Sequence, residues 1–256
     1  DDVFQWVDSP GTRGESRFTR DALIARDAFI NTTYLEVHYN RYLPFTTKIK
    51  HEFNNLSGGT VNVTNGTLAL NATSGTDAGT YNISSGMTLQ IPTNRSFDSG
   101  INFTGTGSLV FNGQTQTFNA AHTFASGGPA VSLITGTLTA DNALNLPGLF
   151  TWTNGRITGA GALNTSGTTT FSNGELVTKT WNNSGTVNFG ASNVVLASPI
   201  ASAVTFNNLG GGIVNLTGAG AFVAGDGFNN PGGGVVTVNN SGTLNKTGAG
   251  SLNINA

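Results

Sequence analysis

The sequence predicts an all-β protein, a parallel β-helix (β-solenoid) with a short N-terminal cap that contains a helix. Two recurring phrases carry this prediction. The first, T-G-x-G-x-(L/F), begins at Thr104, Thr158, Thr217 and Thr247. The second, an aromatic residue followed by Asn-Asn or a close variant, begins at Phe53, Phe171, Trp181, Phe206 and Phe228. Short phrases repeated at loosely constant spacing are typical of stacked repeats, in which each repeat packs on its neighbours.

Alternating apolar residues are the third observation. Thr60–Thr64, Ile213–Thr217 and Val235–Val238 read as short strands with a period of two, and glycine or asparagine bounds each of them. Glycine and asparagine supply the turn conformations that such strands need at their ends. This pattern argues against low-complexity disorder, which the high content of Gly, Ser, Thr and Asn would otherwise suggest.

The composition is polar but weakly charged. The 256 residues include 36 glycines and no cysteine, only 9% are charged, and the formal net charge is −2. Ordinary domains carry about 25% charged residues. The near-neutral balance offers no electrostatic basis for binding nucleic acid or an anionic membrane. The lack of cysteine excludes disulfides and thiolate metal sites, and no apolar run approaches the roughly 18 residues of a membrane-spanning helix.

The N-terminal segment, residues 1–52, differs from the rest of the chain. It holds fifteen of the charged side chains, and the remaining residues hold nine. Phe18–Phe29 has the amphipathic pattern of a helix of about three turns. Tyr34–Leu43 alternates like a strand and is followed by Pro44. We therefore predict a charged cap or assembly arm over 1–52 and solenoid repeats over 53–256.

Aromatic-led phrases set the expected length of one coil. They recur at loosely regular intervals, at Phe150, Phe171, Trp181, Phe206 and Phe228, with one much shorter interval before Trp181. Coils of about 20 to 25 residues would give about nine coils and a rod on the order of 40 Å long. Apolar residues should point inward, Thr and Ser outward, and Gly and Asn should form corners where Asn side chains stack in ladders. The general preference of parallel crossovers favours a right-handed coil.

One stretch carries a family resemblance. Ser241-Gly-Thr-Leu-Asn-Lys-Thr-Gly-Ala-Gly-Ser-Leu-Asn-Ile254 resembles the autotransporter-associated β-strand repeat, whose pattern is close to G-x-L-x-K-x-G-x-G-x-L-x-L. The other three T-G-x-G copies match only the core of that motif and lack its lysine. The resemblance implies an extracellular β-solenoid of the passenger or adhesin type, and it supplies no catalytic or ligand-binding residues.

No pattern in the sequence predicts catalytic, cofactor-binding or metal-binding residues, so no cofactor is expected. The T-G-x-G phrases lack the third glycine and the following helix of a dinucleotide site. His38, His51 and His122 lack metal-ligand spacing, and we expect His122 to face solvent from a strand. Ala224–Gly227 is a lone fragment of a calcium-binding repeat.

Acidic residues after Glu52 stand singly, at Asp77, Asp98, Asp141, Glu175 and Asp226. The basic residues Arg95, Arg156, Lys179 and Lys246 are equally scattered. Arg95 with Asp98 is the closest pair in sequence, and we expect it to form a turn or a surface ion pair. Paired carboxylates, which glycoside hydrolysis requires, are not evident, although acids from different coils could still meet in the folded chain.

The leading hypothesis is a non-enzymatic structural protein, extracellular or at the cell surface, that assembles into a homopolymer. In this hypothesis the N-terminal region of one subunit adds to the last coil of the next, because an uncapped coil presents unpaired backbone groups. The candidate assembly contacts are Tyr34, Leu35, Val37, Tyr39, Tyr42, Leu252 and Ile254. The competing explanation of an uncapped last coil is that the chain is a fragment of a longer protein.

Two alternative functions remain open. In the first, the rod is an adhesin stalk or a module that binds host or matrix glycans. A loop insertion over Ser108–Pro129 would then make the contact, and Trp152 and Trp181 could be sugar platforms, although aromatic residues that open repeats are more often core. In the second, the chain is a β-helix enzyme acting on polysaccharides, or a viral tailspike; the scattered acids argue against it.

Overall fold

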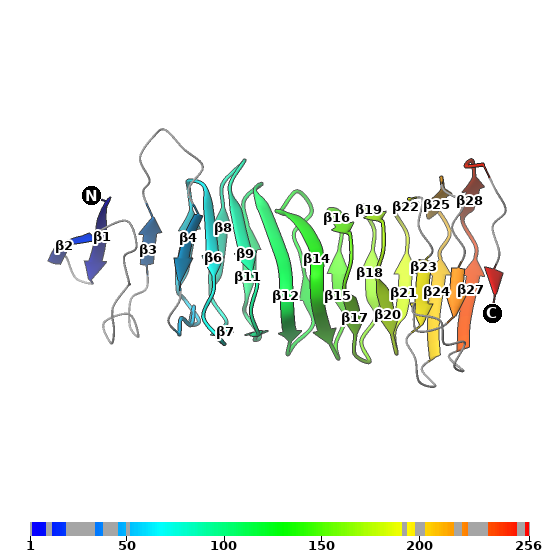
Figure 1. Ribbon diagram of the computed structural model, residues 1–256, viewed down its shortest axis with the longest axis horizontal. Helices are drawn as coiled ribbons and strands as arrows, with labels where there is room; N and C mark the ends of the chain where they lie inside the picture. Colours follow the sequence, from blue (N-terminus) through cyan, green and yellow to red (C-terminus); the bar gives the residue numbers. More distant parts are fainter. Residues whose placement is uncertain are drawn as a thin grey trace.

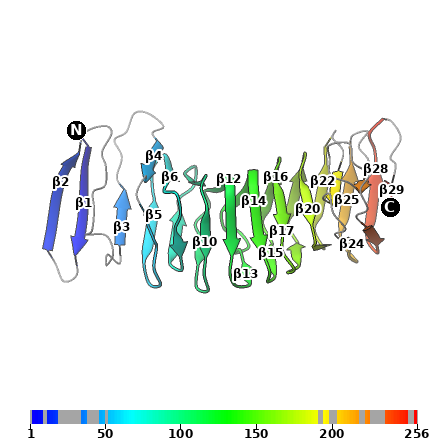
Figure 2. The same ribbon diagram turned by 60° about the horizontal axis from the view of Figure 1, so that its bottom comes forward.

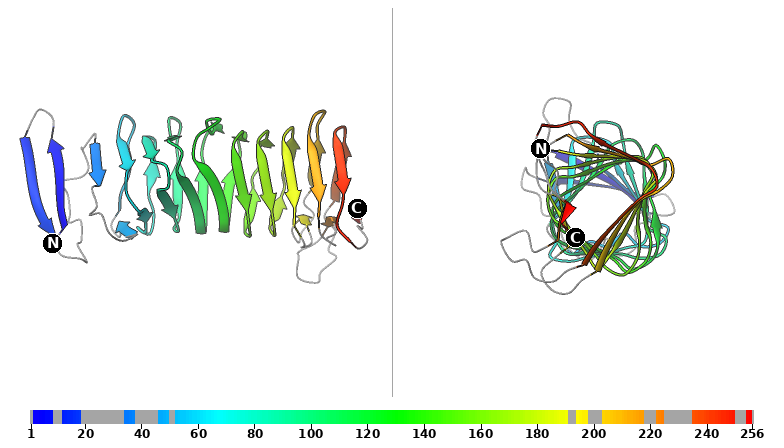
Figure 3. Two further views of the ribbon diagram at one scale, coloured as in Figure 1. Left: turned by 90° about the horizontal axis from the view of Figure 1, so that it is seen from above. Right: turned by 90° about the vertical axis from the view of Figure 1, so that its right-hand side faces the viewer.

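The computed structural model describes residues 2–8, 12–18, 34–37, 46–49, 52–190, 194–197, 203–217, 222–224, 235–249 and 254–255. These residues form strands and turns, without a helix among them, and the strands stack along one long axis (Figure 1). Viewed down that axis, the coils superpose around a common interior (Figure 3). The described part of the chain is therefore an all-β parallel solenoid, as the repeats predict. The expected helix over Phe18–Phe29 falls almost wholly outside the described residues.

Each coil passes through three faces in turn, and every pairing between coils is parallel. The first face holds β3 (Tyr34–Val37), β5 (Thr60–Val63), β8 (Thr80–Ile83), β11 (Asn102–Thr104), β13 (His122–Thr123), β15 (Leu144–Leu146), β18 (Leu163–Thr165), β21 (Thr180–Asn183), β24 (Ala203–Asn208) and β27 (Val235–Asn240). These ten strands form two sheets, β3 to β11 and β13 to β27.

The second and third faces belong to one sheet. The second face holds β4 (Thr46–Ile49), β6 (Thr67–Leu70), β9 (Thr88–Ile91), the first parts of β12 (Ser108–Phe118) and β14 (Ala130–Ala140), β16 (Leu149–Trp152), β19 (Thr168–Phe171), β22 (Thr186–Phe189), β25 (Ile213–Leu216) and β28 (Thr243–Lys246). The third holds β7 (Thr76–Asp77), β10 (Arg95–Phe97), the ends of β12 and β14, β17 (Arg156–Thr158), β20 (Glu175–Val177), β23 (Val194–Ala197), β26 (Phe222–Ala224) and β29 (Ile254–Asn255).

An antiparallel hairpin lies at the N-terminal end of the rod. Its strands are β1 (Asp2–Asp8) and β2 (Thr12–Phe18), paired over their whole lengths. The hairpin lies beyond β3, at the opposite end of the rod from β28 and β29 (Figure 2). β3 and β4, which come from the charged N-terminal segment, already continue the solenoid ladders, because they pair with β5 and β6. The domain boundary at residue 52 remains a prediction.

Residues 52–190 make about seven turns, and β24 and β27 add two rungs to the first face beyond them. Coil lengths follow from the register. The paired residues Asn164 and Asn182 are 18 residues apart. The paired residues Thr123 and Asn145 are 22 residues apart. Later coils are longer, because Asn182 pairs with Asn207 and Asn207 with Asn239. The coil length of about 20 to 25 residues expected from the sequence is close to these separations. The aromatic-led phrases from which it was derived, however, come from two different faces of the solenoid.

The aromatic-led phrases do not all occupy equivalent positions. Phe171 belongs to the second face, where it pairs with Trp152 and Phe189. Trp181 belongs to the first face, where it pairs with Phe206. The short interval between Phe171 and Trp181 is therefore the path from one face to another within a coil, not a short coil.

Stacked apolar residues fill the interior. The strands alternate buried and partly exposed positions, as in β5, β8, β9 and β22. On the second face the ring centroids of Trp152 and Phe171 lie 4.9 Å apart, and those of Phe171 and Phe189 lie 5.3 Å apart. On the first face the ring centroids of Trp181 and Phe206 lie 4.9 Å apart in an edge-to-face arrangement. The regular alternation explains why short strands of Thr, Asn and one or two apolar residues are sufficient for this fold.

The T-G-x-G phrases form corners, as predicted. Gly105 and Gly159 have φ angles of +82° and +103°, which side chains rarely allow. A Cβ atom on Gly105 would lie 2.1 Å from the carbonyl oxygen of Ile83, in the preceding coil. Glycine is thus required twice here, for the turn and for the close approach of two coils. The phrases at Thr217 and Thr247 lie partly outside the described residues.

Asparagine ladders run along the rod. On the first face, Nδ2 of Asn164 donates to Asn145, Asn182 to Asn164, Asn207 to Asn182 and Asn239 to Asn207, at 2.7–2.8 Å. A second ladder on the second face joins Asn188, Asn215 and Asn245 at 2.8–2.9 Å. Both lie on strands rather than at the predicted corners. A third ladder, Asn183, Asn208 and Asn240, does lie where the first face turns.

We expect Asn182→Ala to lower the free energy of unfolding by about 1–2 kcal/mol, because it removes two ladder hydrogen bonds from a partly buried row. Asn245→Ala is the matched control, since Asn245 is exposed and ends its ladder with one such bond. Denaturant unfolding of the two variants would measure the difference. A loss for Asn182→Ala no larger than that for Asn245→Ala would contradict the idea that the partly buried ladder bonds stabilise the rod more than the exposed ones.

Candidate functional site

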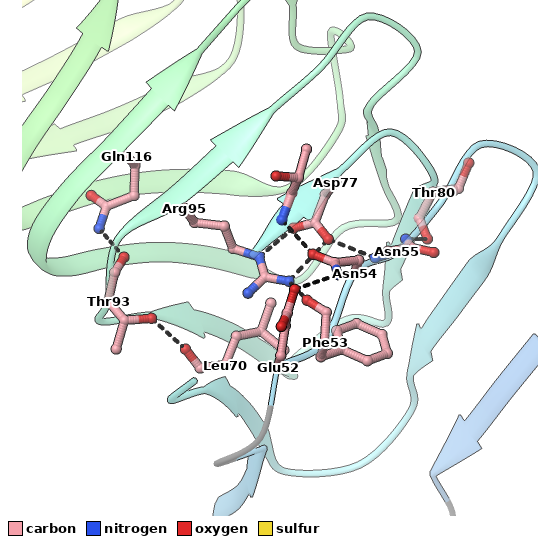
Figure 4. Close-up of polar contacts among 11 residues, drawn as sticks. Glu52, Phe53, Asn54, Asn55, Leu70, Asp77, Thr80, Thr93, Arg95 and Gln116 are labelled. Atoms are coloured by element: carbon pink, nitrogen blue, oxygen red, sulfur yellow. Dashed lines mark hydrogen bonds and ion pairs between the residues drawn. The ribbon is translucent and has the colours of Figure 1, made fainter. Parts of the chain in front are cut away.

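A buried ion pair is the strongest concentration of charge in the described part of the chain. Arg95 on β10 points into the rod and meets Asp77 on β7, in the preceding coil (Figure 4). Nε of Arg95 donates to Oδ2 of Asp77, and Nη2 donates to Oδ1 at 3.0 Å. Both side chains are 0% exposed. The predicted pairing of Arg95 with Asp98 is therefore wrong; Asp98 lies at the end of the third face and accepts a hydrogen bond from Asn119 instead.

The ion pair also binds the backbone of Phe53 and Asn55, at the start of the described range 52–190. Nη2 of Arg95 also donates to the carbonyl oxygen of Phe53, 42 residues earlier and two coils back. Oδ1 of Asp77 accepts the backbone N–H of Asn55 at 2.8 Å. A Cβ atom on Gly75 would lie 2.4 Å from Nη1 of Arg95, so the missing side chain leaves room for the guanidinium.

Electrostatics within the cluster follow from burial. Burial opposes the charge of Arg95, but its hydrogen bonds and charge interactions with Asp77 and Tyr81 prevail, and the pKa of Arg95 is raised. Burial first, and then the charge of Asp77, raise the pKa of Tyr81 well above 10.0. The phenol remains neutral at physiological pH. Because the two charged groups are closed to solvent, a dissolved substrate has no access to them, and their geometry supports a structural role.

A second buried cation also reaches across coils. Nζ of Lys179 donates to the carbonyl oxygens of Ala140, Thr158 and Gly159 at 2.8, 3.2 and 3.2 Å. Ala140 lies 39 residues earlier, so this contact also spans two coils. Burial lowers the pKa of Lys179 to about 8, against the opposing charge of Asp141. Lys179 thus links the corner of its own coil to the corners of the two preceding coils.

Acid and base also meet on the surface. Arg156 on β17 and Glu175 on β20 are register partners, and Nη2 of Arg156 lies 2.6 Å from Oε2 of Glu175. The sequence left open whether charged residues meet across coils, and here they do. This pair is an acid with a base rather than the two carboxylates that glycoside hydrolysis needs. Asp226 lies outside the described residues.

His122 does not face solvent as we expected. Its side chain is 8% exposed and lies among three rings, with its centroid 5.7 Å from Phe103, 5.4 Å from Phe118 and 4.6 Å from Phe124. Burial lowers its pKa to about 4. The spacing contained the correct signal, because His122 and the core residue Phe124 are two positions apart and so share one side of a strand.

The proposed glycan contacts are not exposed. Ser108–Pro129 is not a loop insertion, because it contains β12 and β13, which pair with neighbouring coils. Its aromatic residues Phe111, Phe118 and Phe124 are buried. Trp152 and Trp181 are also buried, which confirms them as core residues rather than sugar platforms.

The candidate assembly contacts are placed in part. Tyr34, Leu35 and Val37 lie in β3 and pair with Thr60, Val61 and Val63 of the same chain. Ile254 lies in β29 and pairs with Phe222. Tyr39, Tyr42 and Leu252 lie outside the described residues. The structure therefore brings none of the described contacts of one end next to those of the other, since β3 and β29 are at opposite ends of the rod (Figure 2).

The described residues offer neither a metal centre nor a membrane helix. No group of three or more His, Cys, Asp or Glu residues there could hold a metal ion. No helix there is long and apolar enough to cross a membrane.

Comparisons of this chain with protein-family models, with curated proteins and with solved structures found no match.

Proposed function

We propose that this chain is a non-enzymatic structural protein, extracellular or at the cell surface, that assembles head to tail into a fibre through its N-terminal segment. One observation supports the proposal above the others. At each end of the described residues, the outermost strand of the second face belongs to the same parallel ladder. Among the described residues, β4 at one end has β6 as its strand neighbour, and β28 at the other end has β25.

Edge strands at opposite ends favour a contact that propagates. An edge presents unpaired N–H and C=O groups, which another chain can pair with. Because all rungs run parallel, the two ends of one molecule are different surfaces, and a contact between them is heterologous. Such contacts build open filaments unless the rotation between subunits closes a ring.

The location outside the cell draws support from two features. One is the resemblance of Ser241–Ile254 to repeats of bacterial surface and secreted proteins. The other is the surface of Thr, Ser and Asn, which keeps stacked coils soluble without rows of like charge. Fractionation of source cells, with antibody detection, tests this part; protein confined to the cytosol would contradict it.

We expect purified protein to form uniform filaments in negative-stain electron microscopy, and we expect deletion of residues 1–52 to leave soluble monomers. The deletion removes the end that would contact the last coil of the next subunit. Circular dichroism is the control, since the shortened rod must keep its β spectrum. Filaments that persist after the deletion would contradict the proposed joint, and isolated rods of the full chain would favour a stalk.

A further inference from the structure

The outward positions of the second face are uncharged from β14 to β28. On β14, β16, β19, β22, β25 and β28, outward residues alternate with buried ones, and the parallel register aligns them in two rows along the rod. The first row is Ala130, Leu149, Thr168, Thr186, Ile213 and Thr243. The second row is Ser132, Thr151, Thr170, Asn188, Asn215 and Asn245. The surface ion pair of Arg156 and Glu175, in contrast, lies on the third face.

Exposed apolar side chains gather on and beside these rows. Of the large hydrophobic side chains that are exposed among the described residues, most belong here. Leu149 and Ile213 lie in the first row and are 49% and 36% exposed. Leu209 precedes β25 at the corner between the first and second faces, and Ile134 lies where the register of β14 shifts. A surface with exposed apolar side chains and without charge has the composition of the centre of a protein interface.

The two rows are complementary to themselves when one rod is turned end over end. A two-fold axis in the plane of the face, along the strand direction between β19 and β22, places each row opposite the same row of a second copy in reverse order. In the first row, Leu149 then faces Ile213 of the second copy, and Thr168 faces Thr186. In the second row, hydroxyl side chains face amides, in the pairs Thr170 with Asn188, Thr151 with Asn215, and Ser132 with Asn245.

The amides of the second row can bind hydroxyl groups across such an interface. Nδ2 of Asn215 donates to Asn188, and Nδ2 of Asn245 donates to Asn215. An amide nitrogen carries two N–H groups, and in the described structure each ladder bond uses one of them. The second N–H can donate to a threonine hydroxyl, which can itself both accept and donate. Polar groups of this face can therefore find partners on a second copy without the burial of a charge.

The area of the face is sufficient for a specific dimer. The coils superpose in the view along the axis, so the face runs along the rod (Figure 3). A strand spacing of about 4.8 Å over these strands, and a width of about 20 Å including one corner residue on either side, give roughly 600 Å² per copy. Two copies would bury about 1,200 Å², which is the lower limit for a specific, stable interface.

We propose that two copies of this chain associate side by side through the second face, antiparallel, about a two-fold axis between β19 and β22. The contact is isologous, so it closes on itself as a dimer. Two uncharged faces meet without repulsion between like charges, and the apolar side chains of each rod are covered by those of the other. This association is independent of head-to-tail assembly, which uses the ends of the rod. Where both occur, filaments should lie in pairs.

The first test identifies the residues that face each other. The chain has no cysteine, so Leu149→Cys and Ile213→Cys each introduce a single thiol. We expect a short bismaleimide to give covalent dimers when the two variants are mixed, and few from Leu149→Cys alone, whose thiols would lie three strands apart along the rod. Leu56→Cys is the matched control partner, because Leu56 is similarly exposed but lies outside the face. Equal yields from Leu149→Cys with either partner would overturn the inference.

The second test introduces charge beside the axis. Thr168→Lys would bring two ammonium groups together, whereas Thr115→Lys places the same charge at an exposed threonine of the third face. We expect Thr168→Lys to raise the dissociation constant of the dimer, measured by sedimentation, by about tenfold or more relative to Thr115→Lys. Mixing Thr168→Lys with Thr168→Glu should restore dimers, because opposite charges then meet.

Equal dissociation constants for the two lysine variants, or a wild-type chain that does not form side-by-side dimers, would overturn the inference. Paired filaments of the wild type and single filaments of Thr168→Lys in electron microscopy would support it, and would leave head-to-tail assembly standing. Dimers without filaments would support it as well, and would instead contradict the proposed function.

Discussion

We expect Arg95→Met to lower the free energy of unfolding by about 3–5 kcal/mol. The reason is the charge left behind. Without Arg95, the carboxylate of Asp77 stays fully buried with no cation beside it, although the N–H of Asn55 still donates to it. The carbonyl oxygen of Phe53 also loses its contact with the guanidinium. Denaturant unfolding at neutral pH, followed by circular dichroism, measures the loss.

The double variant Asp77→Leu, Arg95→Met separates a charge effect from a packing effect. Replacing both members of a buried ion pair by apolar residues of similar volume is often neutral or stabilising. We therefore expect the double variant to be more stable than Arg95→Met alone. If Arg95→Met lowers the free energy of unfolding by less than about 1 kcal/mol, the ion pair does not stabilise the segment at Phe53.

Acid should weaken the rod through His122. Burial among Phe103, Phe118 and Phe124 lowers its pKa from 6.5 to about 4. Between these two pH values the unfolded chain binds a proton that the folded chain does not. Stability is therefore complete above pH 6.5 and falls as the pH drops toward 4, by about 3 kcal/mol from this group. Unfolding experiments at pH 7.5, 6.0, 5.0 and 4.5 would follow the loss.

His122→Phe is the control for this pH dependence, because it keeps an aromatic ring in the cluster and cannot bind a proton. Carboxylates that titrate in the same range affect both proteins, so the difference between them isolates His122. We expect the difference in stability between wild type and variant to be constant above pH 7 and to change below pH 6, where only the wild type loses stability through position 122. Parallel curves over the whole range would show that the imidazole is not buried as a neutral group.

The local sequence predicted the strands well because alternation is a local property. Val61 and Val63 on β5, and Leu89 and Ile91 on β9, are buried as a period of two requires. The glycine corners were equally visible, because positive φ is tied to residue type. The assignment of residues to faces was not predictable in this way. Phe171 and Trp181 looked like successive repeats and proved to lie on different faces.

Contacts between coils were the part that the sequence did not reveal. Arg95 and Asp77 are 18 residues apart, and nothing local favours that partner over Asp98, which is much closer in sequence. The pairing depends on a register that is fixed only once the coil length is known. His122 was misplaced for a different reason. A polar residue was assigned to the outside, although its separation from Phe124 placed it within.

The two cations that reach back two coils have a mechanical consequence. Tension along the rod would peel its coils from one end, each releasing a segment of about 20 residues, or about 60–80 Å of extended chain. Arg95 is hydrogen-bonded to Phe53 and Lys179 to Ala140, in each case two coils away. A coil that carries one of these residues therefore cannot detach without also pulling on the coil two positions away. Under a pulling force, the rod should therefore lengthen in steps of one coil along most of its length and in double steps at these two positions.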